Sequence, residues 1–376
     1  MTRKSRGSGT VSSHGRLTGP ARAALLLIAF GSTAALTTAC SGPGGVDLGT
    51  DWKGARTFAL ARVDGLVTVV GINPDKSRAE SLAVVPQQAD DDDSISPHIV
   101  ELADGRWLLT VPRKGDKPDR RYEVNVKDHT LDGLTGDERL RQILPGKTLV
   151  AEVAEVAEVA GLPDSKSASG SAESSVLVRD PGNWTTKREL KIPGTIDFAA
   201  SDPAADKLCL GSGSGGGDTE ADGNTKISVA NLTDGRITAV SVPSGLDVSG
   251  LGCPSGHPVV VGSPAEGGSG DVKVSLTRSA AETVVSVDGG RTDAVAATDS
   301  SIVVAVADGS DTELVEVDSA TGRELHRARV KGLAGTLNIT PTSAGWLLYA
   351  ENTVTRVDLG TGKAKRFDLP GTLLDS

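Results

Sequence analysis

A repeat with a fixed offset is the feature that most constrains the fold of this 376-residue chain. The segments "EVDSATGRE" at 316–324 and "RVDLGTGKA" at 356–364 share Val, Asp, Thr, Gly and a basic residue at five places, each 40 residues apart. Asp-x-x-Thr-Gly is typical of a tight turn, because the Asp side chain accepts backbone N–H groups and Gly adopts positive φ. Self-similarity at this spacing is typical of arrays of repeated units.

Seven units can be recognised by the strand that enters each hairpin. Successive markers are 56, 52, 51, 45, 43 and 40 residues apart, at Val70, Val126, Val178, Val229, Val274, Val317 and Val357. Aromatic residues make up only 3% of the chain, whereas 46 Gly and 18 Pro residues indicate many turns. We therefore predict an all-β protein, a β-propeller of seven blades. Two β-sandwiches, which also contain many short strands, are the alternative.

The strands of each unit differ in pattern. Continuous apolar segments such as "SIVVAVA" at 301–307 are typical of strands buried on both faces, and we expect them to be inner strands. Alternating segments such as "ELVEVD" at 313–318 are expected further out.

At its turns the chain resembles the repeat of quinoprotein-like and WD40-like β-propellers, with the motif Asp-x-x-Thr-Gly-[Lys/Arg]. The matching residues are Asp318, Thr321, Gly322 and Arg323, and Asp358, Thr361, Gly362 and Lys363. A blurred copy, "NLTDGR", lies at 231–236. In the quinoprotein-like family a Trp follows this motif and locks blade to blade, but no Trp occupies that place here. The resemblance therefore implies the fold and places the chain outside the dehydrogenases that use a quinone and calcium.

The first 39 residues have the pattern of a bacterial lipoprotein signal peptide. A basic segment without acidic residues, 1–22, precedes an uncharged segment, 23–38, which is shorter than the roughly 20 residues that span a bilayer. Thr37-Thr38-Ala39-Cys40 resembles the lipobox, in which the cysteine becomes lipidated and N-terminal. Lipid-anchored actinobacterial propeller proteins share this lipobox and the Ala/Gly/Val/Asp-rich composition. A transmembrane anchor and a plain secreted protein are the alternatives.

This pattern divides the chain into three parts. We expect a signal peptide over 1–39, a flexible tether over 40–54 and the propeller over 55–376, held at the extracytoplasmic face of the cell membrane by lipid on Cys40. From Cys40 onward the chain has 34 basic and 49 acidic residues, a net charge of −15. Such a charge disfavours nucleic acid and anionic lipid as partners, because both require a basic surface.

The other two cysteines indicate a disulfide. Cys209 and Cys253 form an even pair, and exported proteins retain such bonds. Cys209 is expected in an inner strand of one unit and Cys253 just before the inner strand of the next, so the bond would join adjacent blades. Two buried free thiols are the alternative, and neither cysteine has a neighbour at the spacing of zinc ligands.

Candidate catalytic groups are sparse. His98, His129, His257 and His326 lie in different units, and no nucleophile elbow, metalloprotease helix, phosphate loop or dinucleotide fingerprint occurs. Acidic residues cluster at 90–93 and 218–222, but their spacing is not that of a calcium loop, so we expect solvated loops. We expect no catalytic residue, no metal and no cofactor.

Four tryptophans and one short tandem repeat are further candidates for a functional role. Trp107 and Trp346 begin equivalent strands and are expected to pack, whereas Trp52 and Trp184 lie in turn-like contexts and are freer to bind a sugar. "AEVAEVAEVA" at 151–160 repeats every three residues, which is neither a clean strand nor a clean helix pattern. We expect a tandem duplication in a surface loop, and the alternative is a strand that runs on into a short helix in a blade insertion.

Two functions from different classes follow. The first is a non-catalytic binding platform for a protein or envelope component on the blade-top loops, as in scaffold relatives. The second is a small-ligand binder or enzyme that uses the central channel, with calcium as a candidate cofactor. A cell-wall glycan binder is a third option, disfavoured by the few aromatic residues.

Overall fold

The computed structural model describes residues 46–86, 97–112, 119–134, 140–154, 173–213, 225–242, 245–264, 272–277, 281–285, 290–343 and 345–376. The chain divides into a unit Met1–Thr38, of which no residue is described, and a unit Ala39–Ser376. Within the described part of the second unit the regular elements are strands, apart from two short 3-10 turns, η1 (Trp52–Gly54) and η2 (Pro254–Gly256).

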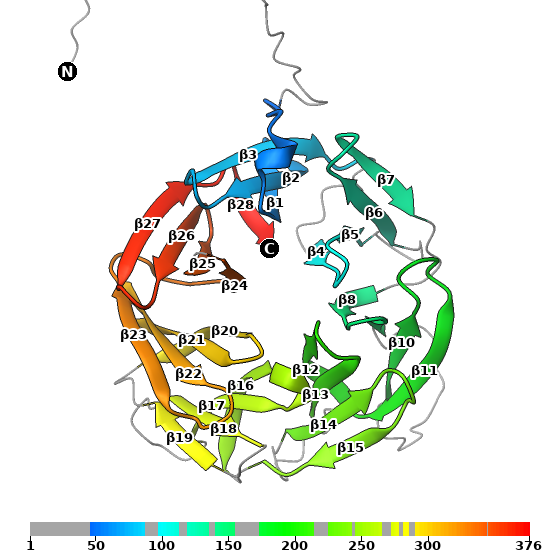
Figure 1. Cartoon of the computed structure of the whole chain (residues 1–376), viewed down its shortest axis with the longest axis vertical. Coiled ribbons are helices and arrows are strands. Elements are labelled where there is room, and N and C mark those ends of the chain that lie inside the picture. Colours follow the sequence, from blue (N-terminus) through cyan, green and yellow to red (C-terminus); the bar gives the residue numbers. More distant parts are fainter. Residues whose placement is uncertain are drawn as a thin grey trace, which may run out of the picture. The chain divides into compact units, whose positions relative to one another are not determined.

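The strands form seven four-stranded antiparallel sheets that follow one another around a ring (Figure 1). We number these blades 1 to 7 from the sheet that contains β1. Their innermost strands are β28 (Thr372–Asp375), β4 (His98–Glu101), β8 (Leu140–Pro145), β12 (Thr195–Asp202), β16 (Leu246–Gly252), β20 (Arg291–Ala297) and β24 (Asn338–Thr342). The all-β propeller of seven blades predicted from the repeat is confirmed.

The second strands are β1 (Thr57–Val63), β5 (Trp107–Val111), β9 (Val150–Ala154), β13 (Lys207–Gly213), β17 (Val259–Pro264), β21 (Ser301–Asp308) and β25 (Gly345–Ala350). These contain the continuous apolar segments, and β5 and β21 are almost wholly buried. A second strand has a ladder partner on each side and a neighbouring blade against each face, so all its side chains leave water. The continuous apolar segments are therefore inner strands, as predicted, and they occupy the second position of each blade counted from the centre of the ring.

The third strands are β2 (Leu66–Asn73), β6 (Arg120–Asn125), β10 (Glu173–Arg179), β14 (Lys226–Asn231), β18 (Val272–Leu276), β22 (Asp311–Asp318) and β26 (Thr353–Asp358). Six of the seven marker valines lie in these strands, one per blade, and Val126 follows β6 directly. The outermost strands are β3 (Arg78–Val84), β7 (Thr130–Leu134), β11 (Thr186–Pro193), β15 (Ile237–Val240), β19 (Ala281–Val285), β23 (Glu324–Val330) and β27 (Lys363–Asp368).

Each blade therefore presents two kinds of connection. Because the strands are antiparallel, the turns from first to second strand and from third to fourth strand lie at one face, which we call the turn face. The turns from second to third strand and the passages to the next blade start and end at the other face, which we call the connector face.

Blade 1 closes the ring by combining the two ends of the propeller. Its innermost strand, β28, pairs with β1, so residues 372–375 complete a sheet that begins at residue 57 (Figure 1). The backbone N–H of Ile99 in blade 2 donates to Asp375 Oδ2 at 2.7 Å, and Asn338 in blade 7 donates to Ser376. Tyr349 and Phe367 of blade 7 pack with Val70 of blade 1 in one buried cluster. The closure thus ties blades 7, 1 and 2 together.

The second part of the predicted tether, 40–54, packs against the propeller. Residues 40–45 lie outside the described residues, but Val46 and Trp52 are buried and belong to the cores of the blade 7–1 and blade 1–2 contacts. The Gly49 N–H donates to the Ser81 carbonyl of β3 at 2.7 Å, and Asp51 N–H donates to Glu80 at 3.2 Å. Residues 46–54 therefore line the outer edge of blade 1, because their apolar side chains are buried there.

Candidate functional site

The predicted turn residues build two equivalent turns at the turn face. Asp318 Oδ1 accepts the Thr321 N–H and the Thr321 hydroxyl, both at 2.7 Å, and these bonds hold the pKa of Asp318 below its ordinary value. Asp358 accepts the Thr361 N–H at 3.2 Å, with the same effect on its pKa. Gly322 has a φ of 74°, in the left-handed region that glycine tolerates. These residues shape turns and lie in different blades, so they form no common site.

The same turn occurs in six blades. In each, an Asn or Asp at the end of the third strand accepts backbone N–H groups ahead of it, and the residue four places later has positive φ. The pairs are Asn73 with Ser77, Asn125 with His129, Asp180 with Trp184, Asn231 with Gly235, Asp318 with Gly322, and Asp358 with Gly362. The turn of blade 5 includes residues 278–280, which lie outside the described residues. An Asn or Asp within three residues of each marker valine is the signal that could have revealed the other copies.

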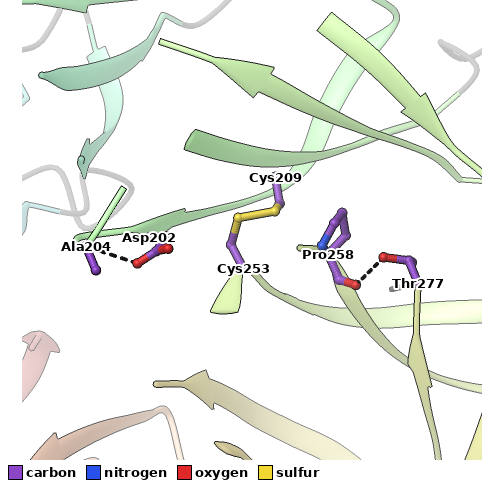
Figure 2. The surroundings of a disulfide bond; sticks show 6 residues. All are labelled: Asp202, Ala204, Cys209, Cys253, Pro258 and Thr277. Carbon is purple, nitrogen blue, oxygen red and sulfur yellow. Dashed lines mark hydrogen bonds between the residues drawn. A yellow bond between two sulfur atoms is a disulfide. The ribbon is translucent and has the colours of Figure 1, made fainter. Parts of the chain in front are cut away.

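The expected disulfide is present and joins adjacent blades. Cys209 in β13 of blade 4 bonds Cys253, which follows β16 of blade 5, with an S–S length of 2.04 Å (Figure 2). Both cysteines are buried. Near them, Asp202 closes the turn after β12 by accepting the Ala204 N–H at 2.8 Å, and Thr277 donates to the Pro258 carbonyl at 2.7 Å. The bond therefore locks the blade 4–5 contact at the turn face.

Several candidates fall outside the described residues. These are Cys40, the acidic run 90–93, the acidic run 218–222 and residues 155–160 of the tandem. Residues 151–154 of the tandem belong to β9, and residues 151–153 are buried. Its first part is therefore the strand of the alternative interpretation and not the expected surface loop.

The tryptophans pack in the fold. Trp107 and Trp346 are buried in second strands, as expected. Trp52 was expected to be free, but it is buried and its ring stacks on His129 with centroids 5.6 Å apart. Trp184 is half-buried, and the Arg121 guanidinium lies 5.8 Å from its ring centroid. Both rings therefore serve contacts between blades.

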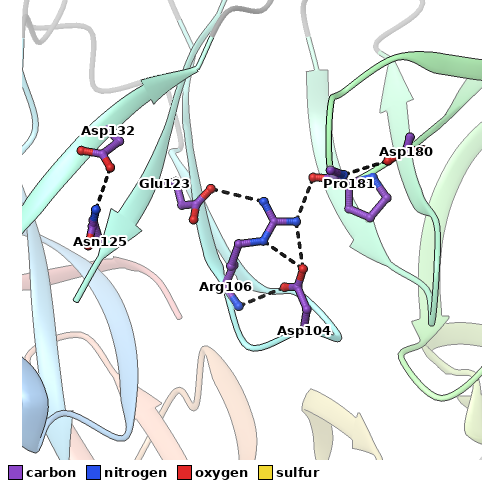
Figure 3. Close-up of polar contacts among 8 residues, drawn as sticks. Asp104, Arg106, Glu123, Asn125, Asp132, Asp180 and Pro181 are labelled. Carbon is purple, nitrogen blue, oxygen red and sulfur yellow. Dashed lines mark hydrogen bonds and ion pairs between the residues drawn. The ribbon is translucent and has the colours of Figure 1, made fainter. Parts of the chain in front are cut away.

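Arginine side chains provide contacts between neighbouring blades. Arg106 of blade 2 donates to the Pro181 carbonyl in the turn of blade 3 at 2.8 Å, while Asp104 and Glu123 hold its guanidinium (Figure 3). Arg188 of blade 3 donates to the Thr233 and Asp234 carbonyls of blade 4, and Arg356 of blade 7 donates to the Pro74 carbonyl of blade 1. Each guanidinium bonds the carbonyls of the third-to-fourth-strand turn in the next blade.

A buried charge cluster supports the contact between blades 2 and 3. Glu152 in β9 is fully buried, and its Oε1 forms an ion pair at 2.7 Å with Arg121 Nη1, from β6 of blade 2. Arg179 in β10 donates to the other carboxylate oxygen of Glu152 and to Thr186. Two cations thus share one carboxylate out of contact with water, an arrangement that is costly unless every partner stays in place.

A hollow of about 200 Å³ lies at the turn face where the ring closes. Blade 1 lines it with Arg56, Thr57, Pro74 and Asp75, blade 2 with Glu101, and blade 7 with residues 340–343. Partial burial raises the pKa of Glu101 above its ordinary value. The Tyr349 hydroxyl is buried behind the hollow, near the hydroxyls of Thr57 and Thr340, and burial raises its pKa. The hollow thus offers hydroxyl groups and both signs of charge, which suits a polar occupant.

The described ranges contain no metal-binding cluster and no membrane-spanning helix. Among those residues, no three His, Cys, Asp or Glu side chains converge as a metal site would require. No helix in the described part of the chain is long and apolar enough to cross a membrane.

Comparison with known proteins supports the fold alone. No protein-family model matches the sequence, and no curated protein sequence matches it. An acylaminoacyl peptidase solved with Z-Gly-Gly-Phe-chloromethyl ketone aligns at 11% identity and a TM-score of 0.55, covering 82% of this chain and 49% of that one. The acylaminoacyl peptidase of Pyrococcus horikoshii aligns at 10% identity and 0.50, covering 83% and 52%.

TolB from Acinetobacter baumannii aligns at 13% identity with a TM-score of 0.47, covering 74% of this chain and 64% of that one. The chain therefore spans between about half and two thirds of the length of these structures. At these identities the comparisons concern the β-propeller fold, and the roles of those proteins do not transfer to this chain.

Proposed function

We propose that the chain is a lipid-anchored, extracytoplasmic β-propeller that serves as a non-catalytic binding platform for a protein partner on its blade-top loops. The lipobox-like Thr37-Thr38-Ala39-Cys40 motivates the anchor. The Cys209–Cys253 disulfide supports export, because such bonds persist in oxidising compartments.

The observation that carries the proposal is the path of residues 46–54. Val46 and Trp52 fix this segment on the outer edge of blade 1, away from the centre of the ring. Five residues, 41–45, lie between Cys40 and Val46, so a fully extended chain would span about 20 Å from the lipobox cysteine to that edge. An anchor attached at the rim leaves both faces of the propeller available to a partner, as a platform requires.

The anchor is tested by replacing Cys40 in the full chain. We expect the wild-type protein to partition into the detergent phase of solubilised membranes, and Cys40→Ala to lose that partition. Ser41→Ala is the matched control, since it changes the adjacent residue but leaves the lipobox cysteine and the Cys209–Cys253 disulfide intact. Equal partition of wild type and Cys40→Ala would contradict the anchor.

The platform is tested by crosslinking the native protein in intact membranes and identifying the captured proteins by mass spectrometry. One reproducible partner, crosslinked through loops of one face, is the expected result. Recovery of uncrosslinked monomer alone, beside a membrane complex that crosslinks under the same conditions, would refute it.

The hollow at the ring closure favours a second candidate function, the binding of a small polar ligand. Its hydroxyl groups and the charges of Arg56, Asp75 and Glu101 suit a polar solute. A ligand or metal retained through purification and detected by native mass spectrometry would favour this function over the platform.

A further inference from the structure

Two charged residues of opposite sign line the hollow at the ring closure without a partner. Arg56 precedes β1 in blade 1, and Glu101 ends β4 in blade 2. Within the part of the chain that the structure describes, neither side chain takes part in a hydrogen bond or an ion pair, with the other or with a third residue. Partial burial raises the pKa of Glu101, and no nearby cation offsets this effect. Arg56 therefore does not neutralise Glu101 across the hollow.

The other charges beside the hollow are already paired. Asp75, which also lines the hollow, forms an ion pair with Arg356 of blade 7 at 3.8 Å. Its neighbour Lys76 pairs with Asp51 at 3.3 Å. Of the three charged residues that line the hollow, Arg56 and Glu101 thus remain available to a solute.

We propose that the hollow binds a small zwitterion of the α-amino acid type, with the carboxylate of the ligand at Arg56 and its ammonium group at Glu101. A guanidinium group donates two parallel N–H groups to a carboxylate, and an ammonium group donates to carboxylate and hydroxyl oxygens. One ligand that carries both groups satisfies both charges of the hollow, whereas a singly charged solute leaves one of them unpaired. The inference rests on the second candidate function, the binding of a small polar ligand, and names the class of that ligand.

The lining also limits the side chain of the ligand. The volume of about 200 Å³ equals that of about seven waters in the liquid and is below the roughly 300–1,000 Å³ of pockets for drug-sized ligands. One amino acid with a short side chain therefore fits better than a peptide. Pro74 and Pro341 offer apolar surface to a methyl group, and the hydroxyls of Thr340 and Ser343 offer hydrogen bonds. Glycine, alanine and serine are the expected ligands.

Isothermal titration calorimetry on the full chain, purified in detergent, tests the class of ligand without any substitution. The probes are glycine, L-alanine and L-serine, and the matched solutes are propionate and ethylamine, which carry one charge each. We expect the amino acids to bind about tenfold or more tightly than either singly charged solute, because one further charge-assisted contact is worth about a factor of ten in affinity.

Two variants assign the two ends of the ligand. Glu101→Gln should weaken the binding of alanine about tenfold and leave that of propionate no weaker, since propionate has no ammonium group. Arg56→Gln should weaken alanine to the same extent and leave ethylamine no weaker. Glu351→Gln is the matched control, because Glu351 is exposed in the turn between β25 and β26, at the connector face. We expect it to bind alanine as the wild type does.

Three results would overturn the inference. Absence of heat with all three amino acids would mean that the hollow takes no ligand of this class. Equal affinity for alanine, propionate and ethylamine would mean that the two charges do not act on one ligand. Equal binding of alanine by the wild type, Glu101→Gln and Arg56→Gln would place the bound amino acid elsewhere on the protein.

Native mass spectrometry then separates this inference from the candidate function on which it rests. A retained solute that is not a zwitterion, together with no binding of the amino acids, would refute the zwitterion and leave the small-ligand function standing. Absence of both a retained solute and amino acid binding would count against both. The crosslinking test of the platform does not depend on either result.

Discussion

Glu152 offers the sharpest test of how the blades are held together. Its carboxylate is fully buried in β9 and is shared by Arg121 of blade 2 and Arg179 of blade 3. Glu152→Gln keeps the size of the side chain but removes the negative charge. Two guanidinium groups, with 2% and 11% of their side chains exposed, would then lie beside a neutral amide.

The magnitude follows from the burial of the charges. An ion pair about 4 Å apart is worth about 4 kcal/mol at the effective dielectric constant of protein sites, and desolvation of the carboxylate offsets part of the gain from two pairs. Removing one member of a buried cluster costs about 3–5 kcal/mol. We therefore expect Glu152→Gln to destabilise the protein by about 3–5 kcal/mol, a large part of the 5–15 kcal/mol typical of folded proteins.

Urea denaturation with the disulfide intact measures this loss, with far-UV and near-UV circular dichroism followed together. Coincident transitions are needed before a free energy is derived, since repeated architectures can unfold in parts. Glu189→Gln is the matched control, because Glu189 lies in the outermost strand of the same blade and is exposed. We expect its midpoint to match that of the wild type.

A loss below about 1 kcal/mol for Glu152→Gln would refute the reasoning, because such values are typical of solvated surface pairs. A second variant examines the cause. When Arg179→Leu is added to Glu152→Gln, one of the two buried cations is removed, so the double variant should lose less stability than the two single changes added together.

Two further predictions concern the disulfide and the response to acid. Replacing Cys209 and Cys253 together by Ser should cost about 4 kcal/mol, the chain-entropy value for their separation of 44 residues. Thermal unfolding of the variant beside the oxidised wild type measures this loss, and an unchanged midpoint would contradict a role of the disulfide in stability. The pKa values of Asp318 and Asp358 are lowered in the fold, so their contribution is complete above the ordinary pKa of 3.8 and is lost as pH falls through the lowered values. The urea concentration at the midpoint of unfolding should therefore decrease when the pH is lowered below about 4. The Asp318→Asn variant should show a smaller decrease.

The inter-blade contacts also explain how a chain poor in aromatic residues builds a propeller. Arg106, Arg188 and Arg356 bond carbonyl groups in the turn of the next blade, and the buried charge cluster and the disulfide add two more connections. Guanidinium groups suit this role because each carries several N–H donors that point in different directions within one plane. The blades are therefore joined by polar contacts at the turn face and by aliphatic packing inside.

The architecture could be predicted from the sequence alone because the signals that specify it act between residues close together in the chain. Turn chemistry at Asp318 and Asp358 and the apolar runs act within a few residues, so the repeat, the seven marker strands and the all-β class could be predicted from adjacent letters. The bond between Cys209 and Cys253 also followed, since the repeat places them in neighbouring units.

Contacts between distant segments were decided only by the tertiary structure. Glu152 lies in a tandem that resembles a loop, and only the approach of Arg121 and Arg179 makes it a buried anion. In the sequence Trp52 lies in a turn-like context that suggests an available side chain, but in the structure its ring stacks on His129 of blade 2. The pairing of β28 with β1 joins residues about 300 apart in sequence. The physical reason is that pairing across the ring is set by closure of all seven blades, which no local pattern encodes.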